Sequence, residues 1–372
     1  MSAVPKSKRL KSLDIFRGFT MLLMILVNNP GDWDQLYYPL KHKVWHGCSL
    51  TDLIFPYFIF MMGVSMTFSL KKAKEVPEFR KSAYLKALKR GGKLIAIGLF
   101  INLLPFFEFD TWRYFGVLQR IGIIFICCVP LYFNTDWKGL LALAIIILGG
   151  YFAFINYVPV PGVGLPDLDL KDQNIGAYID YALFKDHLWI HSKTWDPEGL
   201  ISTIPAVVTA ILGLLSGLWI QAKRANGFEL VAGLFIGGFA LLVLGEWWGL
   251  SFPINKSLWT SSFVLYSGGY SLMTLGLFYW LLDIHQVSSP LWKIFEVFGT
   301  NAIGAFIFSN LLVKFFEFFT IDGLNLLSLF YQQLILPAFE PKTASLVYAL
   351  IITSVNFIPM WWLYRKNIIL KV

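Results

Sequence analysis

Charged side chains are scarce in this sequence. Asp, Glu, Lys and Arg together make up 15% of its 372 residues, against roughly 25% in soluble domains. Hydrophobic residues account for 56% of the chain, and the mean hydropathy is +0.62. This composition excludes an ordinary water-soluble domain and predicts a protein embedded in a lipid bilayer.

Cysteine is also rare. Cys48, Cys127 and Cys128 offer no disulfide framework, and the adjacent pair lies in an apolar run where packing is the simplest role. No C-x-x-C or H-E-x-x-H pattern occurs, so we predict no metal site. His187 and His191 are four residues apart, but a solvated helix face explains that spacing better than a metal site.

Long apolar runs dominate what is present. Windows of about 20 apolar residues can each cross a bilayer as a helix. The sequence therefore predicts an all-α membrane protein, a polytopic bundle of about ten transmembrane helices in one domain covering residues 1–372. The predicted windows are 13–31, 50–70, 92–107, 114–133, 138–157, 199–221, 228–247, 258–282, 292–318 and 343–364. A re-entrant or interfacial segment is an alternative within 314–342.

The net charge of +8 is divided between the two membrane sides. Lys and Arg outnumber the acidic residues on the side that would hold both termini, most densely over 71–93, and Asp and Glu predominate on the other side. This bias predicts cytoplasmic N- and C-termini and an extracytoplasmic loop at 158–198. Topology and anionic lipid explain the basic side without a nucleic-acid partner. Attraction of a phosphate-bearing ligand is the alternative.

Polar side chains gather near the ends of the first two windows. Asn28 ends the first, Asp52 opens the second, and His42 lies in the loop between them. Polar groups at membrane depth are costly unless they are paired or used. A histidine can act as a general base, a carboxylate can orient its ring, and an amide can hold an oxyanion. Alternatively, Asp52 favours a helix start and Asn28 ends a helix.

Three basic residues also have open interpretations. Arg17 lies three residues after Asp14, so the two form an ion pair or Arg17 offers a cation to a phosphate. Arg120 lies inside a window and needs a partner, for which a carboxylate such as Glu246 is one candidate. Lys256 could extend to the interface.

Motifs in order along the chain carry a family resemblance. They include SLDIFRG, VNNPG, KHKVWHG and TDLIFPYFIFMMG within 12–63, FGVLQRIGI at 115–123, AYIDYALFKDHLW at 177–189, DPEGLISTIP at 196–205, PINKSLW at 253–259 and GTNAI at 299–303. Together these segments resemble the heparan-α-glucosaminide N-acetyltransferase family of transmembrane acyltransferases. That family moves an acetyl group from cytosolic acetyl-CoA across the membrane to the amino group of a terminal glucosamine.

The resemblance implies roles for individual residues. His42 matches the family's active-site histidine and Asn28 its active-site asparagine, whereas His46 falls where the lysosomal enzyme has asparagine and receives no catalytic role. Lysosomal members carry an additional N-terminal region and span, so we expect a bacterial member in the inner (plasma) membrane. Its acceptor would be an amino sugar or a cell-envelope glycan, and the family suggests a homodimer.

These inferences give one working hypothesis. Acetyl-CoA would enter from the basic side, and an amino sugar from the other. His42, Asn28 and Asp52 would be catalytic, by direct transfer or through an acetyl-histidine. The expected CoA-binding residues are Asp14, Arg17 and Arg120. The expected acceptor-binding residues are Asp180, His187, Asp196, Glu198 and Lys256, of which the first four could instead cap and pin the loop.

Two other classes of function fit parts of the sequence. A permease for an amino sugar would have similar spans and in-span polar residues, would not require CoA, and would tolerate His42→Gln unless it were proton-coupled. A non-catalytic membrane partner would leave the polar cluster over 28–52 unexplained.

Overall fold

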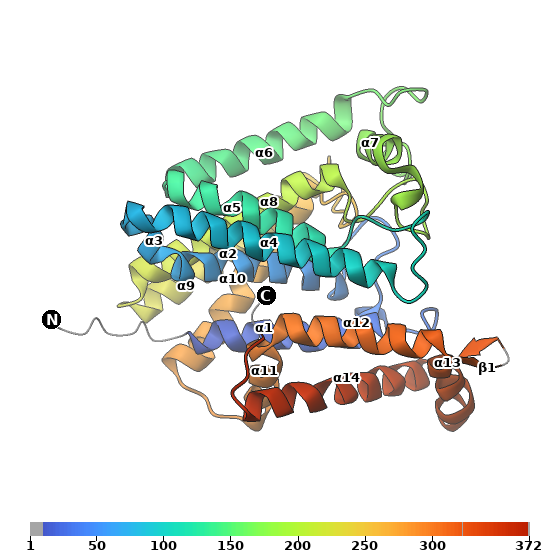
Figure 1. Cartoon of the computed structure of the whole chain (residues 1–372). Helices are drawn as coiled ribbons and strands as arrows, with labels where there is room; N and C mark the ends of the chain where they lie inside the picture. The colour runs from blue at the N-terminus through green and yellow to red at the C-terminus, as the bar shows by residue number, and fades with distance from the viewer. Residues whose placement is uncertain (1–9, 322, 371–372) are drawn as a thin grey trace.

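A computed structural model describes residues 10–321 and 323–370 and confirms the all-α fold (Figure 1). Within that part of the chain the only sheet is a two-stranded hairpin, β1 (Thr320–Ile321) with β2 (Leu324–Asn325). The helices are α1 (Lys11–Asn28), α2 (Ile54–Ser69), α3 (Lys71–Glu75), α4 (Arg80–Leu103), α5 (Val117–Asn134), α6 (Trp137–Tyr157), α7 (Ile175–Phe184), α8 (Leu200–Lys223), α9 (Gly227–Gly249), α10 (Ser261–Tyr279), α11 (Pro290–Thr300), α12 (Ala302–Phe318), α13 (Leu326–Phe330) and α14 (Pro341–Arg365).

Six of the described helical segments are long and apolar enough to cross a membrane. They are Thr51–Ser69, Val117–Asn134, Trp137–Tyr157, Leu200–Lys223, Gly227–Gly249 and Pro341–Arg365. Counting the bent pair α11 and α12 as one span gives seven. Helices α1, α4 and α10 coincide with further predicted windows without meeting these criteria, so the predicted count of ten is not confirmed.

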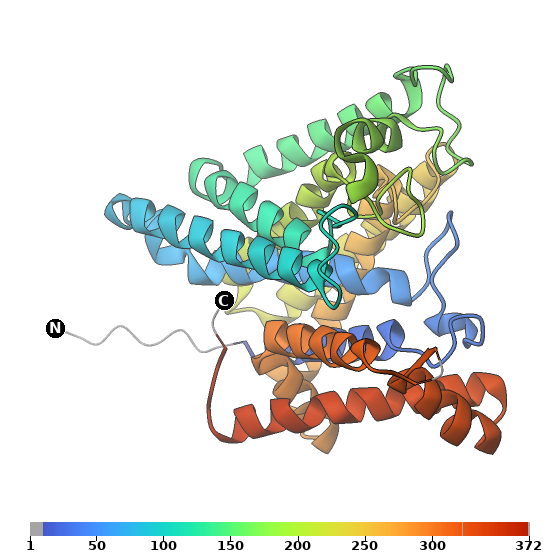
Figure 2. The ribbon, with the colours of Figure 1, turned by 45° about the vertical axis from the view of Figure 1, so that its right-hand side comes forward.

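The helices form two layers that meet at α1 (Figures 1 and 2). One layer holds α11, α12 and α14, and the other holds α2, α4, α5, α6, α8, α9 and α10. Helix α1 contacts α11 and α14 on one side and α2 and α10 on the other. Its crossing with α11 requires glycine, because a Cβ atom would lie 1.6 Å from the Phe295 oxygen at Gly18 and 2.0 Å from the Asp14 oxygen at Gly299. Such small residues let helix backbones approach closely.

The predicted single window 292–318 is wrong in one respect. The chain bends by 80° between α11 and α12, at Asn301. The Asn301 side chain donates to the Ile368 oxygen at 2.9 Å and accepts from the Leu370 amide at 2.8 Å. The break in the helix thus holds Ile368 and Leu370 against the bundle. The two short strands follow α12, and an apolar helical segment, Leu326–Ala338, leads to α14.

Candidate active site

The loop between α1 and α2 places His42 beside the start of α2. His42 Nδ1 lies 2.7 Å from Asp52 Oδ1. The Asp52 side chain is only 2% exposed, whereas that of His42 is 36% exposed. A short 3₁₀ turn, Thr51–Leu53, carries Asp52, so the loop folds back over ten residues to form the pair.

Four further donors hold the Asp52 carboxylate. Its Oδ2 atom accepts the Ser49 amide at 3.0 Å, the Ser49 hydroxyl at 2.8 Å and the Lys43 amide at 3.2 Å. Lys256 Nζ, from the loop between α9 and α10, lies 3.4 Å from Oδ1. A buried carboxylate with this many charge-assisted bonds stays ionised and fixed in place.

These contacts determine which nitrogen of His42 is free. The Asp52 carboxylate can only accept, so His42 Nδ1 carries the hydrogen and Nε2 keeps its lone pair. Burial, and after it the Lys256 ammonium, lower the pKa of His42 below its ordinary value of 6.5, against the opposite effect of Asp52. His42 is therefore a neutral imidazole at neutral pH, with one nitrogen ready to accept a proton.

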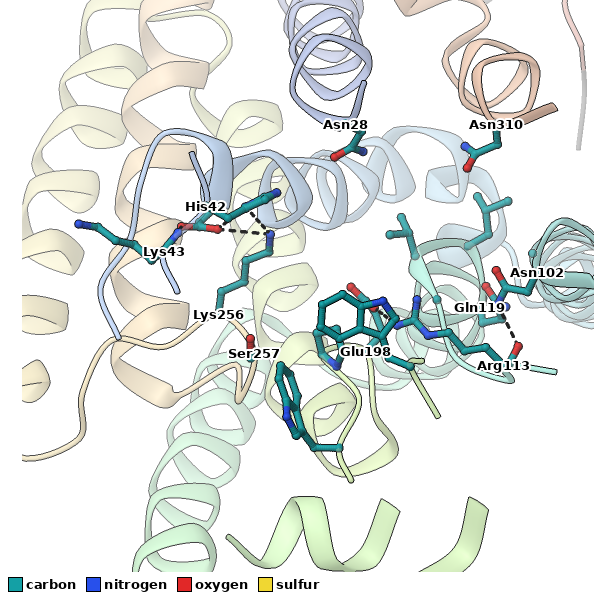
Figure 3. Close-up of a pocket in the computed structure, with 18 of the residues that line it drawn as sticks. Asn28, His42, Lys43, Asn102, Arg113, Gln119, Glu198, Lys256, Ser257 and Asn310 are labelled. Atoms are coloured by element: carbon teal, nitrogen blue, oxygen red, sulfur yellow. Dashed lines mark hydrogen bonds and ion pairs between the residues drawn. The ribbon is translucent and has the colours of Figure 1, made fainter. Parts of the chain in front are cut away.

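His42 faces a cavity of about 450 Å³ (Figure 3). Asn28, Asp52 and Lys256 line it too, as do Asn310 from α12 and Glu198 before α8. Figure 3 shows the Asn28 and Asn310 amides directed into this space from α1 and α12. Among the hydrogen bonds of the described residues, none involves the Asn28 amide, so its donors face the cavity unused. We call this space the His42 cavity.

A second cavity of about 530 Å³ adjoins the first. The two share Val117, Leu118 and Phe306 as lining residues. The second cavity lies toward the opposite end of α1, where Arg17 and Arg90 line it, and five methionines form much of its wall: Met21, Met24, Met61, Met62 and Met66. We call it the Arg17 cavity. The two cavities together run from one end of the bundle toward the other.

The predicted pair of Asp14 and Arg17 forms. Arg17 Nη1 lies 3.3 Å from Asp14 Oδ1, and Arg17 Nη2 donates to the Ser65 hydroxyl at 3.0 Å. Of these two ion-paired residues, Arg17 lines the Arg17 cavity and Asp14 does not. Asp14 therefore acts on a ligand there only through Arg17.

The loop 158–198 is pinned by the acidic residues expected to bind an acceptor. Arg113 donates to both oxygens of Asp196, at 2.8 and 2.6 Å, and to Glu198 at 2.6 Å. Although burial would lower the pKa of Arg113, these carboxylates raise it. Asp180 accepts the Leu200 amide at 3.0 Å, and burial raises its pKa to about 7. Of the three acidic residues, only Glu198 lines the His42 cavity.

The other two candidate histidines fix loops. His187 Nδ1 donates to the Trp112 oxygen at 2.9 Å, and its ring stacks on Tyr114 with centroids 4.1 Å apart. His46 Nε2 bonds to Asp169 at 3.0 Å, and Asn255 donates to its Nδ1 at 3.3 Å. Neither lines the His42 cavity, so the predicted contact of His187 with an acceptor has no geometric support here.

Arg120 lies apart from both cavities, so the structure does not bring it to the expected CoA site. It is 1% exposed, and it donates to the Gly199 oxygen at 3.2 Å and to the Ser202 hydroxyl. Its guanidinium lies 5.0 Å from the centre of the Trp259 ring. The suggested partner Glu246 forms no ion pair with it among the described residues.

Sequence reasoning missed several residues of the His42 cavity. Three tryptophans belong to its wall, and Trp195 packs edge-on against both Trp45 and Trp189. The other missed polar residues are Lys43, Lys171, Asn102, Arg113, Gln119, Ser257 and Asn310. Only the tryptophans gave a usable signal, because an aromatic residue in a polar loop often contacts a ligand or another loop.

Comparisons with known proteins bear on the same residues. A family model described as "Heparan-alpha-glucosaminide N-acetyltransferase, catalytic" matches residues 9–174, which include Asn28, His42 and Asp52. The heparan-alpha-glucosaminide N-acetyltransferase of Homo sapiens is 28% identical over 376 residues, covering 86% of this chain and 55% of the relative. By these matches the chain is similar to the heparan-α-glucosaminide N-acetyltransferase family. The Mus musculus protein of the same name is 27% identical over 367 residues, covering 84% and 55%.

The chain spans about half the length of the curated relatives it matches. The N-acetyltransferase activity in the name of the human and mouse relatives is a property of those proteins.

Proposed function

We propose that this chain is a membrane acetyltransferase that uses acetyl-CoA as donor and an amino sugar as acceptor. The observation that carries the proposal is the oriented pair of His42 and Asp52 in a cavity that adjoins a second one. A donor and an acceptor can occupy the two cavities at once, and they would meet near the shared residues Val117, Leu118 and Phe306.

His42 acts as the general base. Its Nε2 atom takes a proton from the acceptor amine while the nitrogen attacks the thioester carbonyl carbon. The C–N bond forms, the C–S bond breaks, and the imidazolium returns the proton to the departing CoA sulfur. Asp52 holds the ring in the required tautomer and stabilises the imidazolium. Direct transfer needs only this one base, so we favour it over an acetyl-histidine.

Asn28 stabilises the oxyanion in this mechanism. Its amide faces the cavity and, among the described residues, donates to no other group. A preorganised donor of this kind is worth most where negative charge develops. Lys256, close to both His42 and Asp52, keeps the His42 ring neutral before the reaction.

The Arg17 cavity suits the donor. Arg17 and Arg90 offer cations to the phosphates, while the methionine wall suits a flexible, largely apolar arm. Helix α4 extends this basic character, because its first part carries exposed Lys81, Lys86 and Lys89. This end would be cytoplasmic in the proposed orientation, with both termini inside.

The acceptor amine would pair with Glu198 in the His42 cavity. Burial opposes ionisation, but Arg113, Arg120 and Lys256 lower the pKa of Glu198. An ionised carboxylate can hold the substrate ammonium, which gives one proton to solvent before the neutral amine attacks. The acceptor would reach the cavity from the extracytoplasmic side of a bacterial plasma membrane.

Transfer of labelled acetyl from acetyl-CoA to glucosamine tests the proposal. Purified protein in detergent is assayed with a panel of amino sugars, with His42→Ala and His46→Ala alongside. We expect labelled N-acetyl sugar from the wild type and from His46→Ala, and none from His42→Ala. A folded wild type that neither binds CoA nor transfers acetyl would refute the proposal and favour an amino-sugar permease.

A further inference from the structure

A third cavity opens beside the His42 cavity. It measures about 320 Å³ and lies between α4, α5 and α8. We call it the side groove. Its apolar lining residues are Ile95, Leu99, Trp112, Phe115, Ile123 and Leu200.

The side groove is continuous with the candidate active site. Gln119 and Glu198 line both spaces. Glu198 also bonds to Arg113, so this shared wall belongs to the network that shapes the His42 cavity. A molecule with its polar part near His42 could therefore extend past Gln119 into the side groove.

The side groove lies beside two candidate membrane spans. Helices α5 and α8 are both candidate spans, and the groove is lined by the first two turns of each. Ile123 is 37% exposed and Leu200 is 41% exposed, so the groove reaches the surface that faces hydrocarbon in a bilayer. A long alkyl chain fits such an apolar space, while a second sugar would be desolvated there without partners.

Polar residues also line the side groove, among them Gln119, Arg120 and Glu198. Arg120 lines it and is 1% exposed. Its Nε and Nη1 atoms have no hydrogen-bond partner among the described residues. Buried donors are nearly always satisfied. Oxygen atoms at the junction between a sugar and its chain would satisfy these two.

We propose that the acceptor is an amphiphile, an amino sugar carrying a long hydrocarbon chain, whose chain lies in the side groove while its amine reaches His42. This inference rests on the proposed acetyl transfer. It makes the acceptor a membrane component rather than a free sugar or a soluble glycan.

Chain-length dependence tests the proposal. Protein in phosphatidylcholine nanodiscs is given labelled acetyl-CoA and methyl, butyl, octyl or dodecyl β-glucosaminide. Each buried methylene is worth about fourfold in binding, so kcat/KM should rise at least 100-fold from methyl to octyl. Partition into the bilayer also raises the local concentration of the long-chain glucosaminides. The chain-length dependence of the wild type is therefore compared with that of variants of the side groove.

Ile123→Trp narrows the side groove, and Ile146→Trp is its control. Ile146 is 68% exposed on α6 and lines none of the three cavities. We expect Ile123→Trp to lower the octyl-to-methyl ratio of kcat/KM at least tenfold, and Ile146→Trp to keep the wild-type ratio. Equal ratios in all three proteins would overturn the proposal and leave the groove to a structural lipid.

Direct binding separates this inference from the proposed function. Calorimetric titration of dodecyl glucosaminide needs no turnover. Weaker binding to Ile123→Trp than to the wild type and the control supports the side groove even if no acetyl is transferred. Equal affinities overturn it even if glucosamine is acetylated.

Discussion

Two networks of carboxylates and cations border the His42 cavity, and they differ in what they leave unused. In the first, Asp52 bonds to His42 and Lys256, and the second nitrogen of His42 stays free. In the second, Arg113 is bonded to both Asp196 and Glu198. A network supports proton transfer only if a titratable atom remains uncommitted. The first network is suited to proton transfer, whereas the second mainly holds the loop and, of its two carboxylates, presents only Glu198 to the His42 cavity.

The largest expected effect comes from removing the free base. His42→Gln keeps the side chain's size and polarity but cannot accept a proton, so kcat should fall by about 10²–10⁴. Acetyl transfer from labelled acetyl-CoA measures it. The thermal midpoint should stay near that of the wild type, since His42 is exposed by a third. An active His42→Gln variant would contradict the assignment of the base.

Breaking the second network should affect stability instead. Arg113→Met leaves Asp196 and Glu198 without their cation in a buried setting, and such losses cost about 3–5 kcal/mol. Thermal unfolding in detergent, followed by fluorescence, measures the loss. The matched control is Lys193→Met, in an exposed part of the same region, with an expected change within about 0.5 kcal/mol. Equal thermal midpoints for both variants would show that the Arg113 network does not stabilise the loop.

Removal of the Asn28 amide should have an intermediate effect. Loss of one oxyanion donor typically costs about 10²–10³ in kcat, so Asn28→Ala should lower kcat by that amount with a small change in KM. The control is Asn29→Ala, because Asn29 bonds to the Ile25 oxygen within its own helix. A change confined to KM would move Asn28 from stabilising the oxyanion to binding a substrate.

Whether a contact in the site could be predicted from the sequence depends on how far apart its two residues lie along the chain. His42 and Asp52 are ten residues apart, so a short loop was enough to predict their meeting. Lys256 is 204 residues from Asp52 and Arg113 is 83 from Asp196. No local pattern encodes such partners, since helix packing alone brings them together. The break at Asn301 was missed because apolar residues flank Gly299, Thr300 and Asn301 on both sides and no proline marks the break.

The smallest expected effect is a shift in pH dependence, and it concerns Lys256 within the first network. Burial and the Lys256 ammonium both lower the pKa of His42. In Lys256→Met the burial remains but the ammonium is gone, so that pKa should rise. The base form of His42 is then lost at a higher pH on acidification, and the acidic limb of kcat/KM moves upward. Lys43→Met is the control, because Lys43 Nζ is bonded to the exposed Tyr38 hydroxyl. This substitution should leave the acidic limb of kcat/KM in place. A downward shift in Lys256→Met, or the same shift in both variants, would mean that Lys256 acts on a substrate rather than on His42.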